Sequence, residues 1–213
     1  MTSRFTMAKG KKNTDVRQSE NNDRIRVRNR SLLSQHWARL EKVSFDYLRS
    51  DGSWQQLERE IYHRGHGAAI LLYNLEYCTI VLTRQFRFPA WELGGNGFLL
   101  EVPAGVIEGN DPVATVQVET RQETGFVIER PSFLFKAFAT PGSVTEQLYY
   151  YAATYDPANK VSCGGGVVEE GEDIEVLEVP VEKAIRWSMD GTIEDAKTIL
   201  LIQYAQLHIF SPQ

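Results

Sequence analysis

The sequence predicts an α/β protein in which a mixed sheet lies between helices, preceded by a small antiparallel β appendage. Short stretches rich in β-branched and aromatic residues recur along the chain, and capped or apolar-periodic helical segments stand among them. A hairpin signal precedes both. With 213 residues and 42% apolar content, the chain can bury a full core as one domain with an appendage.

The first 30 residues are basic and contain few large apolar side chains. They hold nine Lys or Arg and three Asp or Glu, a net charge of +6, although the whole chain carries −5. This composition predicts a flexible tail over residues 1–30. A nucleic-acid-binding arm is the alternative, but no aromatic residue stands among the basic ones after Phe5, so nucleic acid is not an expected partner. The acidic Asp15, Glu20 and Asp23 disfavour a transit peptide.

Residues 31–66 predict the appendage. In the stretch WARLEKVSFDYLRSDGSWQQLEREIYHRG, apolar and polar residues alternate on both sides of SDG, which favours a hairpin. We expect a small antiparallel unit here and the main domain over residues 67–213.

The main domain contains strand-like and helix-like segments in mixed order. Its strands are expected at residues 68–73, 79–86, 98–102, 133–138, 147–153 and 174–179. Helices are expected at 112–124, 181–189 and 195–208. This order predicts a mixed sheet covered by helices.

The helix at 112–124 is identified by its ends and carries acidic residues. Asp111 suits its N-cap and Gly125 the left-handed residue that follows it. Residues three and four apart share a helix face, so Glu119, Gln122 and Glu123 are expected to project together. One reading of this face is a solvated helix surface, and the other is a metal site.

The string EVPAGVIEGNDPVATVQVETRQETGF resembles a Nudix box, whose form is G-x5-E-x7-R-E-U-x-E-E-x-G-U, with U a large apolar residue. The match places the two helix glutamates on Glu119 and Glu123, and the opening glycine on Gly105 after one deletion. Val118 replaces the Arg of the motif, and Gln122 replaces the first Glu of its EE pair. The resemblance implies the Nudix α/β/α sandwich.

Further segments are similar to one branch of this family, the nucleoside-diphosphate-sugar pyrophosphatases, and within it to the GDP-mannose pyrophosphatases. They are REIYHRGHGAAILLYN, VLTRQFR, TPGSVTE, GGGVVEEGEDIEVLEVP and DAKTILL. The resemblance implies hydrolysis of GDP-mannose to GMP and mannose 1-phosphate. ADP-ribose, cleaved to AMP and ribose 5-phosphate, is the alternative substrate.

The acidic residues also imply a cation. A diphosphate is repelled by Glu119 and Glu123 unless a cation lies between them, and Mg²⁺ prefers carboxylate and phosphate oxygens. By resemblance the metal ligands are Glu119, Glu123, the carbonyl of Ala104 and Glu172, with Mn²⁺ as an alternative metal.

A general base is expected from the acidic loop VVEEGEDIE, which the glycines at 164–166 leave free to move. The resemblance assigns the base to Glu172, with Glu170 beside it, so that Glu119, Glu123, Glu170 and Glu172 form the catalytic set. The alternative reading of the loop is an exposed acidic turn.

Substrate contacts are likewise assigned by resemblance. Arg87 is favoured over Arg84 for a phosphate contact, and Trp37 corresponds to an aromatic residue beside the base, although a half-buried hairpin residue is an equal reading. In the family some of these contacts come from the partner subunit, so a homodimer is expected. The full substrate set is Trp37, Glu58, Arg59, Glu60, Arg87, Ala104, Gly105, Val106, Glu146 and Lys197.

The remaining features suggest a cytoplasmic protein. No apolar run reaches the length of a membrane span and the N-terminus lacks a secretory signal, so no membrane partner is expected. Cys78 and Cys163 have no metal-binding spacing and are interpreted as reduced thiols.

Gln122 leaves two hypotheses open. It cannot carry the charge of the glutamate that it replaces. The chain is then either an active metal-dependent enzyme that relies on Glu119, Glu123 and the loop acids, or a nucleotide-sugar binding module that has lost turnover. The surviving acids favour the enzyme.

Overall fold

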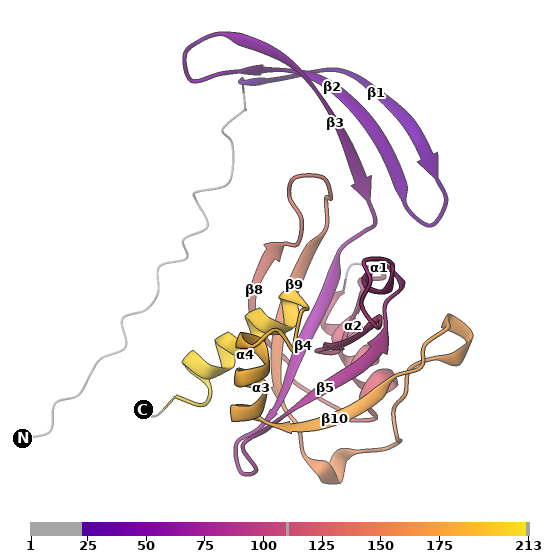
Figure 1. Ribbon diagram of the computed structural model, residues 1–213, viewed down its shortest axis with the longest axis vertical. Helices are drawn as coiled ribbons and strands as arrows, with labels where there is room; N and C mark the ends of the chain where they lie inside the picture. The colour runs from indigo at the N-terminus through magenta and orange to yellow at the C-terminus, as the bar shows by residue number, and fades with distance from the viewer. Residues whose placement is uncertain (1–22, 110, 212–213) are drawn as a thin grey trace, which may run out of the picture. The chain divides into compact units, whose positions relative to one another are not determined.

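The computed structural model describes residues 23–109 and 111–211 (Figure 1). The described chain forms two compact units. Residues 23–35 and 40–61 make up the first, and residues 36–39 and 62–211 make up the second.

The first unit contains a three-stranded sheet with the order β1-β2-β3. Its strands are β1 (Ile25–Gln35), β2 (Arg39–Leu48) and β3 (Trp54–His63). The predicted hairpin turn lies between β2 and β3, where Asp51 accepts hydrogen bonds from the Ser53 amide and hydroxyl. The sheet was expected to be smaller, because residues 25–30 were assigned to the tail. They pair instead in β1, where Arg28 and Arg30 form ion pairs with Asp46 and Glu41. The rest of the predicted tail, residues 1–22, lies outside the described residues.

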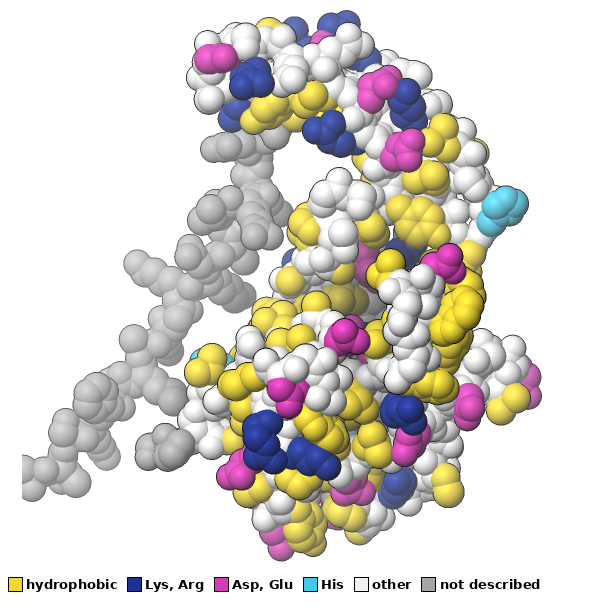
Figure 2. Space-filling model, in the orientation of Figure 1, with side chains coloured by type: hydrophobic (Ala, Val, Ile, Leu, Met, Phe, Trp, Pro, Cys, Tyr) yellow, Lys and Arg dark blue, Asp and Glu magenta, His cyan; other side chains and the backbone are white. Residues whose placement is uncertain are grey.

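This sheet has almost no core of its own. Val43 is the one fully buried apolar residue in its described strands. Large apolar side chains are exposed on it instead, among the charged groups that Figure 2 shows on its surface; they are Ile25, Val27, Leu32, Leu33 and Trp54.

The second unit is built on a seven-stranded sheet with the main order β10-β5-β4-β9-β8. Its strands are β4 (Gly67–Asn74), β5 (Thr79–Phe86), β6 (Phe98–Glu101), β7 (Ala104–Val106), β8 (Ser132–Phe138), β9 (Gln147–Thr154) and β10 (Glu175–Pro180). β6 pairs with β5 and β7 pairs with β4. The sheet is mixed, as predicted, because β4 and β9 run parallel, whereas β10–β5, β4–β5, β4–β7, β5–β6 and β8–β9 are antiparallel pairs.

Helices cover both faces of this sheet (Figure 1). They are α1 (Phe88–Glu92), α2 (Pro112–Glu119), α3 (Val181–Met189) and α4 (Ala196–His208), and a π-helical turn, η1 (Thr120–Thr124), follows α2. Short 3₁₀ turns are η2 (Pro157–Asn159) and η3 (Val168–Glu170).

Alternate residues of β4 separate the two core layers. Leu71 packs in a cluster with Leu201 of α4, whereas Ile70 packs in a cluster with Val116 of α2. The predicted sandwich of helices on both faces of a mixed sheet is therefore confirmed.

The predicted elements of the second unit all occur, with ends shifted by no more than a few residues. Among the strands and α-helices, β7 and α1 were not predicted, and the short turns η2 and η3 were not predicted either. β7 has only three residues, two of them Ala and Gly, so it carries no strand pattern. α1 has no buried residue, and apolar side chains remain exposed on and around it, including Phe88, Trp91 and Leu93. Within the described ranges, no helix combines the length and the apolar character needed to cross a bilayer.

Candidate active site

Helix α2 brings Glu119 against the strand β7. Asp111 caps the helix by accepting hydrogen bonds from the amides of Val113 and Ala114, at 3.0 and 3.1 Å. Glu119 is the last residue of α2 and is half-buried. A Cβ atom on Gly105 would overlap the Glu119 carboxylate, so only glycine allows this approach. Glu119 therefore lies directly against the backbone of Gly105 in β7.

Gln122 and Glu123 are neighbours in the π-helical turn η1, but their side chains differ in exposure. Glu123 is 1% exposed, whereas Gln122 is exposed to solvent. The expectation that Glu119, Gln122 and Glu123 project together is therefore wrong for Gln122. A π-turn holds more residues than an α-turn, so the residue three positions after Glu119 is turned away from the face that Glu119 and Glu123 still share.

Other carboxylates gather around Glu119 and Glu123. Burial, followed by the charges of Glu172, Glu170 and Glu108, raises the pKa of Glu119 to about 7. Burial also raises the pKa of Glu123 well above its usual value, with further increases from Glu119 and Glu172. Arg87 opposes this rise. Glu123 Oε2 is buried and has no hydrogen-bond partner.

The acidic loop is tied to the end of η1. The amides of Gly165 and Gly166 donate to the carbonyls of Glu123 and Gln122, at 2.9 and 3.0 Å. The glycines at 164–166 were expected to leave the loop free to move, which stays a prediction. In the structure Gly164 allows the loop to lie close to η1, since a Cβ there would overlap the Glu123 carbonyl oxygen. Beyond these glycines, Glu172 is half-buried, and its Oε2 accepts a hydrogen bond from the Val167 amide at 2.8 Å.

Glu170 lies in η3 and is exposed, although its charge contributes to the raised pKa of Glu119. The structure thus brings Glu119, Glu123 and Glu172 into electrostatic contact, with Glu170 at the margin.

Arg87 and Lys197 meet at one buried carboxylate, Glu101, which is 2% exposed. Arg87 donates to Oε1 from Nε at 2.7 Å and to Oε2 from Nη2 at 3.1 Å. Lys197 Nζ donates to Glu101 Oε2 at 2.5 Å and to Asp195 Oδ1 at 3.0 Å. Burial favours a raised pKa for Glu101, but the hydrogen bonds and charges of Arg87 and Lys197 outweigh it and hold the pKa below its usual value.

Sequence reasoning did not identify Glu101 or Asp195 as part of the site. A signal for Glu101 was present, since it is a charged residue in the otherwise apolar strand FLLEV.

Glu146 and Trp37 both contact Arg64. Glu146 is 8% exposed and forms an ion pair with Arg64 Nη1 at 3.3 Å. The Arg64 guanidinium lies 5.3 Å from the centre of the Trp37 ring. Trp37 is 72% exposed, so the reading as a half-buried hairpin residue is wrong. Arg64 is a further residue that the sequence did not single out.

Glu58, Arg59 and Glu60 lie on β3 in the first unit, with their side chains exposed. Glu58 pairs with Lys42 at 2.7 Å and accepts a hydrogen bond from Ser44 at 3.0 Å. Their contact with a nucleotide stays a prediction.

The carboxylates fit a hard divalent cation. In residues 23–109 and 111–211, no three His, Cys, Asp or Glu side chains converge closely enough to hold a metal by themselves. Mg²⁺ does not need such a group, because it binds through one or two carboxylates together with substrate oxygens and water. The unpartnered Oε2 of Glu123 is the kind of buried oxygen that a cation would satisfy.

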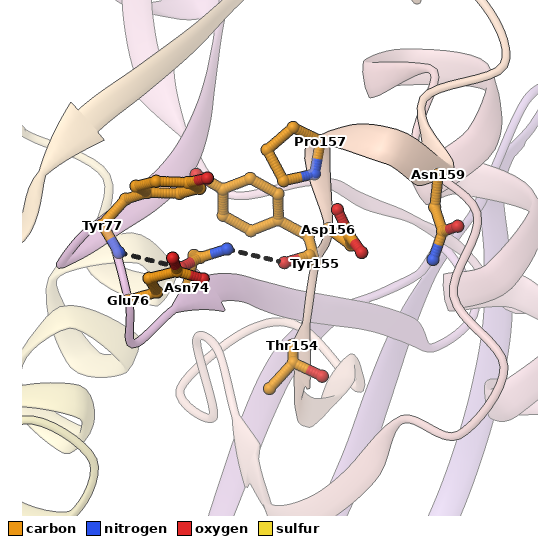
Figure 3. Close-up of a pocket in the computed structure, with 8 residues that line it drawn as sticks. All are labelled: Asn74, Glu76, Tyr77, Thr154, Tyr155, Asp156, Pro157 and Asn159. Carbon is orange, nitrogen blue, oxygen red and sulfur yellow. Dashed lines mark hydrogen bonds between the residues drawn. The ribbon is translucent and has the colours of Figure 1, made fainter.

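A separate pocket of about 330 Å³ lies at the other end of β4 (Figure 3). Its lining includes Asn74, the last residue of β4, whereas β7 pairs with the first residues of that strand. Asn74 bridges the pocket wall by accepting from the Tyr77 amide and donating to the Tyr155 carbonyl. None of the predicted site residues lines it.

Comparison with known proteins identifies the family of the chain. Residues 24–62 match the family described as the GDP-mannose pyrophosphatase NudK N-terminal domain. The chain is 44% identical over 180 residues to a GDP-mannose pyrophosphatase of Yersinia pestis (strain Pestoides F), covering 84% of this chain and 90% of the relative. It is 45% identical over 182 residues to one of Pectobacterium atrosepticum, covering 85% and 93%. With this identity over most of both lengths, the chain belongs to the GDP-mannose pyrophosphatase family of the Nudix hydrolases.

Proposed function

We propose that this protein hydrolyses the pyrophosphate bond of GDP-mannose with Mg²⁺, giving GMP and mannose 1-phosphate. The observation that carries the proposal is the buried Glu123 carboxylate, whose Oε2 has no partner and which lies in electrostatic contact with Glu119 and Glu172. Two relatives that are 44% and 45% identical to this chain are named GDP-mannose pyrophosphatases.

The proposed metal ligands are Glu119, Glu123, Glu172 and the main-chain carbonyl of Ala104. Bound there, the cation supplies charge neutralisation for the phosphoryl group and a lowered pKa for a bound water. Mn²⁺ is the alternative cation.

The chain's own residues then orient the reactants. Arg87 and Lys197 bind the diphosphate oxygens, and the backbone of Gly105 and Val106 lines the phosphate path. Glu172, with Glu170 as the neighbouring alternative, accepts a proton from the attacking water. The water oxygen forms a bond to one phosphorus of the diphosphate as the bond from that phosphorus to the bridging oxygen breaks. The bridging oxygen leaves with the other phosphate and carries the negative charge.

The nucleoside and sugar contacts are proposed from Trp37, Glu146 and the β3 residues Glu58, Arg59 and Glu60. The β3 residues act from the partner subunit of a homodimer. The exposed apolar side chains of the first sheet support this dimer, since that sheet buries only one apolar residue fully. Sedimentation at several concentrations tests it, and a monomer throughout would contradict it. The cytoplasmic location stays a prediction.

The exposure of Gln122 favours the enzyme over a binding module. The side chain of Gln122 is exposed, whereas that of Glu123 is buried. The glutamate that Gln122 replaces would therefore have been an exposed carboxylate, and the buried carboxylate of the motif, Glu123, is retained.

The test is a phosphate-linked turnover assay of GDP-mannose, ADP-ribose and UDP-glucose with Mg²⁺, using the wild type and Glu123→Gln. We expect GDP-mannose to have the highest kcat/KM and Glu123→Gln to abolish turnover. A higher kcat/KM for ADP-ribose would show that ADP-ribose, and not GDP-mannose, is the preferred substrate. Tight binding of GDP-mannose without turnover would contradict the enzyme hypothesis and support the hypothesis of a nucleotide-sugar binding module.

A further inference from the structure

Glu101 occupies an unusual position between two cations. It is almost fully buried, and both its oxygens are engaged by Arg87, with Lys197 sharing one of them. A carboxylate in this state has little remaining capacity to bind a metal or a substrate. Glu101 can therefore affect catalysis in two ways, through its hold on Arg87 and Lys197 and through its charge, which raises the pKa of Glu123.

The two cations come from distant parts of the chain. Arg87 immediately precedes α1, and Lys197 lies in the first turn of α4. Both have long side chains that lose considerable rotamer entropy when they are fixed. The shared carboxylate fixes the guanidinium plane through two hydrogen bonds and brings the ammonium to the same point.

The bonds to Glu101 leave donors available on both cations. Arg87 uses Nε and one Nη2 proton, so Nη1 and the second Nη2 proton remain. Lys197 uses two of its three protons, one for Glu101 and one for Asp195. Arg87 is also close enough to Glu123 for each charge to affect the pKa of the other. The charge of Arg87 therefore acts on Glu123, one of the proposed metal ligands.

Glu101 is not required to attach α4 to the sheet. Asp195 caps α4 by accepting hydrogen bonds from the Thr198 amide at 2.9 Å and from its hydroxyl at 2.6 Å. The Val102 amide, at the end of β6, donates to the same hydroxyl at 2.8 Å. These contacts join α4 to the strand without the carboxylate of Glu101.

We propose that Glu101 is a positioning residue that holds Arg87 and Lys197 as a fixed pair of diphosphate-binding cations. This inference rests on the proposed function, because it needs both cations to contact the substrate. Glu101 then acts on the reaction by setting the separation and orientation of their free donors.

The first test replaces Glu101 by glutamine, which has the same shape but no charge. Glutamine keeps one acceptor oxygen, and its NH₂ group cannot accept a hydrogen bond, so the three hydrogen bonds from Arg87 and Lys197 cannot all be kept and the geometry of the two cations relaxes. We expect kcat/KM for GDP-mannose to fall about 100-fold, as misplacement by about 1 Å produces, with a rise in KM and a fall in kcat. Tyr155→Phe is the matched control. It also removes partly buried hydrogen bonds, to Thr79 and Glu178, but at the other end of the sheet.

The control separates positioning from stability. Both variants are assayed at a temperature at which thermal melts show them fully folded. Tyr155→Phe should keep the wild-type kcat and KM. Wild-type kinetics in folded Glu101→Gln would overturn the inference.

A double-mutant cycle tests whether Glu101 acts through Lys197. If it does, Glu101→Gln combined with Lys197→Ala loses much less kcat/KM than the product of the two single losses. Independent, multiplicative losses would overturn the positioning role. Absence of turnover in the wild type with Mg²⁺ would instead contradict the proposed function, so the two failures are distinguishable.

Discussion

The Glu119 carboxylate lies in the space that a side chain on Gly105 would occupy. The first prediction is that Gly105→Ala displaces Glu119, lowers kcat/KM sharply and destabilises the fold by about 1–3 kcal/mol through overpacking. Steady-state kinetics and denaturant unfolding measure the two effects. Gly142→Ala is the control, since a Cβ there meets no atom within 4 Å. Equal kinetics for the two variants would contradict the prediction.

The second prediction concerns the neighbours Gln122 and Glu123. Gln122→Glu restores the acid of the motif at an exposed position and should change kcat/KM by no more than about two- to threefold, as surface substitutions do. Glu123→Gln removes a proposed metal ligand that is buried, and a loss of several kcal/mol corresponds to about 1000-fold or more. A large gain in Gln122→Glu would show that position 122 reaches the site.

The third prediction is a dependence of stability on pH in metal-free protein. The folded-state pKa of Glu119 is about 7 and that of Glu123 is also raised, whereas both ionise near 4.5 in the unfolded chain. The unfolded state therefore loses these protons first, so their contribution is most favourable below about pH 4.5 and is lost as pH rises through about 7.

Melting temperatures in EDTA between about pH 5 and pH 8 test this dependence. Glu123→Gln should lose less stability over that range than the wild type, because it lacks one of the two raised groups. Mg²⁺ should raise the wild-type melting temperature at the upper pH more than that of Glu123→Gln. If the melting temperatures of the wild type and of Glu123→Gln change equally with pH, the raised pKa of Glu123 does not explain the pH dependence of stability.

The fourth prediction compares two glycines of the acidic loop. Gly166 and Gly171 both have positive φ, +82° and +80°, so alanine strains the backbone at either position. A Cβ on Gly166 would also lie 2.5 Å from Glu172 Oε2, whereas one on Gly171 meets nothing within 4 Å. We expect both variants to lose about 1–2 kcal/mol of stability, but only Gly166→Ala to lower kcat. Equal kcat values would argue against a catalytic role for Glu172.

Local signals were sufficient for most elements of the second unit. The Asp111 cap correctly predicted the start of α2, and apolar enrichment located β4, β5 and β9. β1 was partly assigned to the tail because its alternating arginines resemble a solvated basic segment. Their acidic partners lie on β2, and composition alone does not show such pairing.

The orientation of Gln122 could not be read from the sequence for a similar reason. The hydrogen bonds from Gly165 and Gly166 to the carbonyls of η1 come from a loop about 40 residues away. An i, i+4 rule assumes a regular helix and does not include such long-range backbone contacts. The Glu101 network was missed because its partners are likewise distant in sequence.

The separation of 96 residues between Glu101 and Lys197 also has a consequence for folding kinetics. Bringing them together requires closure of a long loop, and the parallel pairing of β4 with β9 is non-local as well. Helical circular dichroism can therefore recover during refolding before this pair of cations has assembled. The return of hydrolysis would report completion of the native topology, which a spectroscopic helix signal does not.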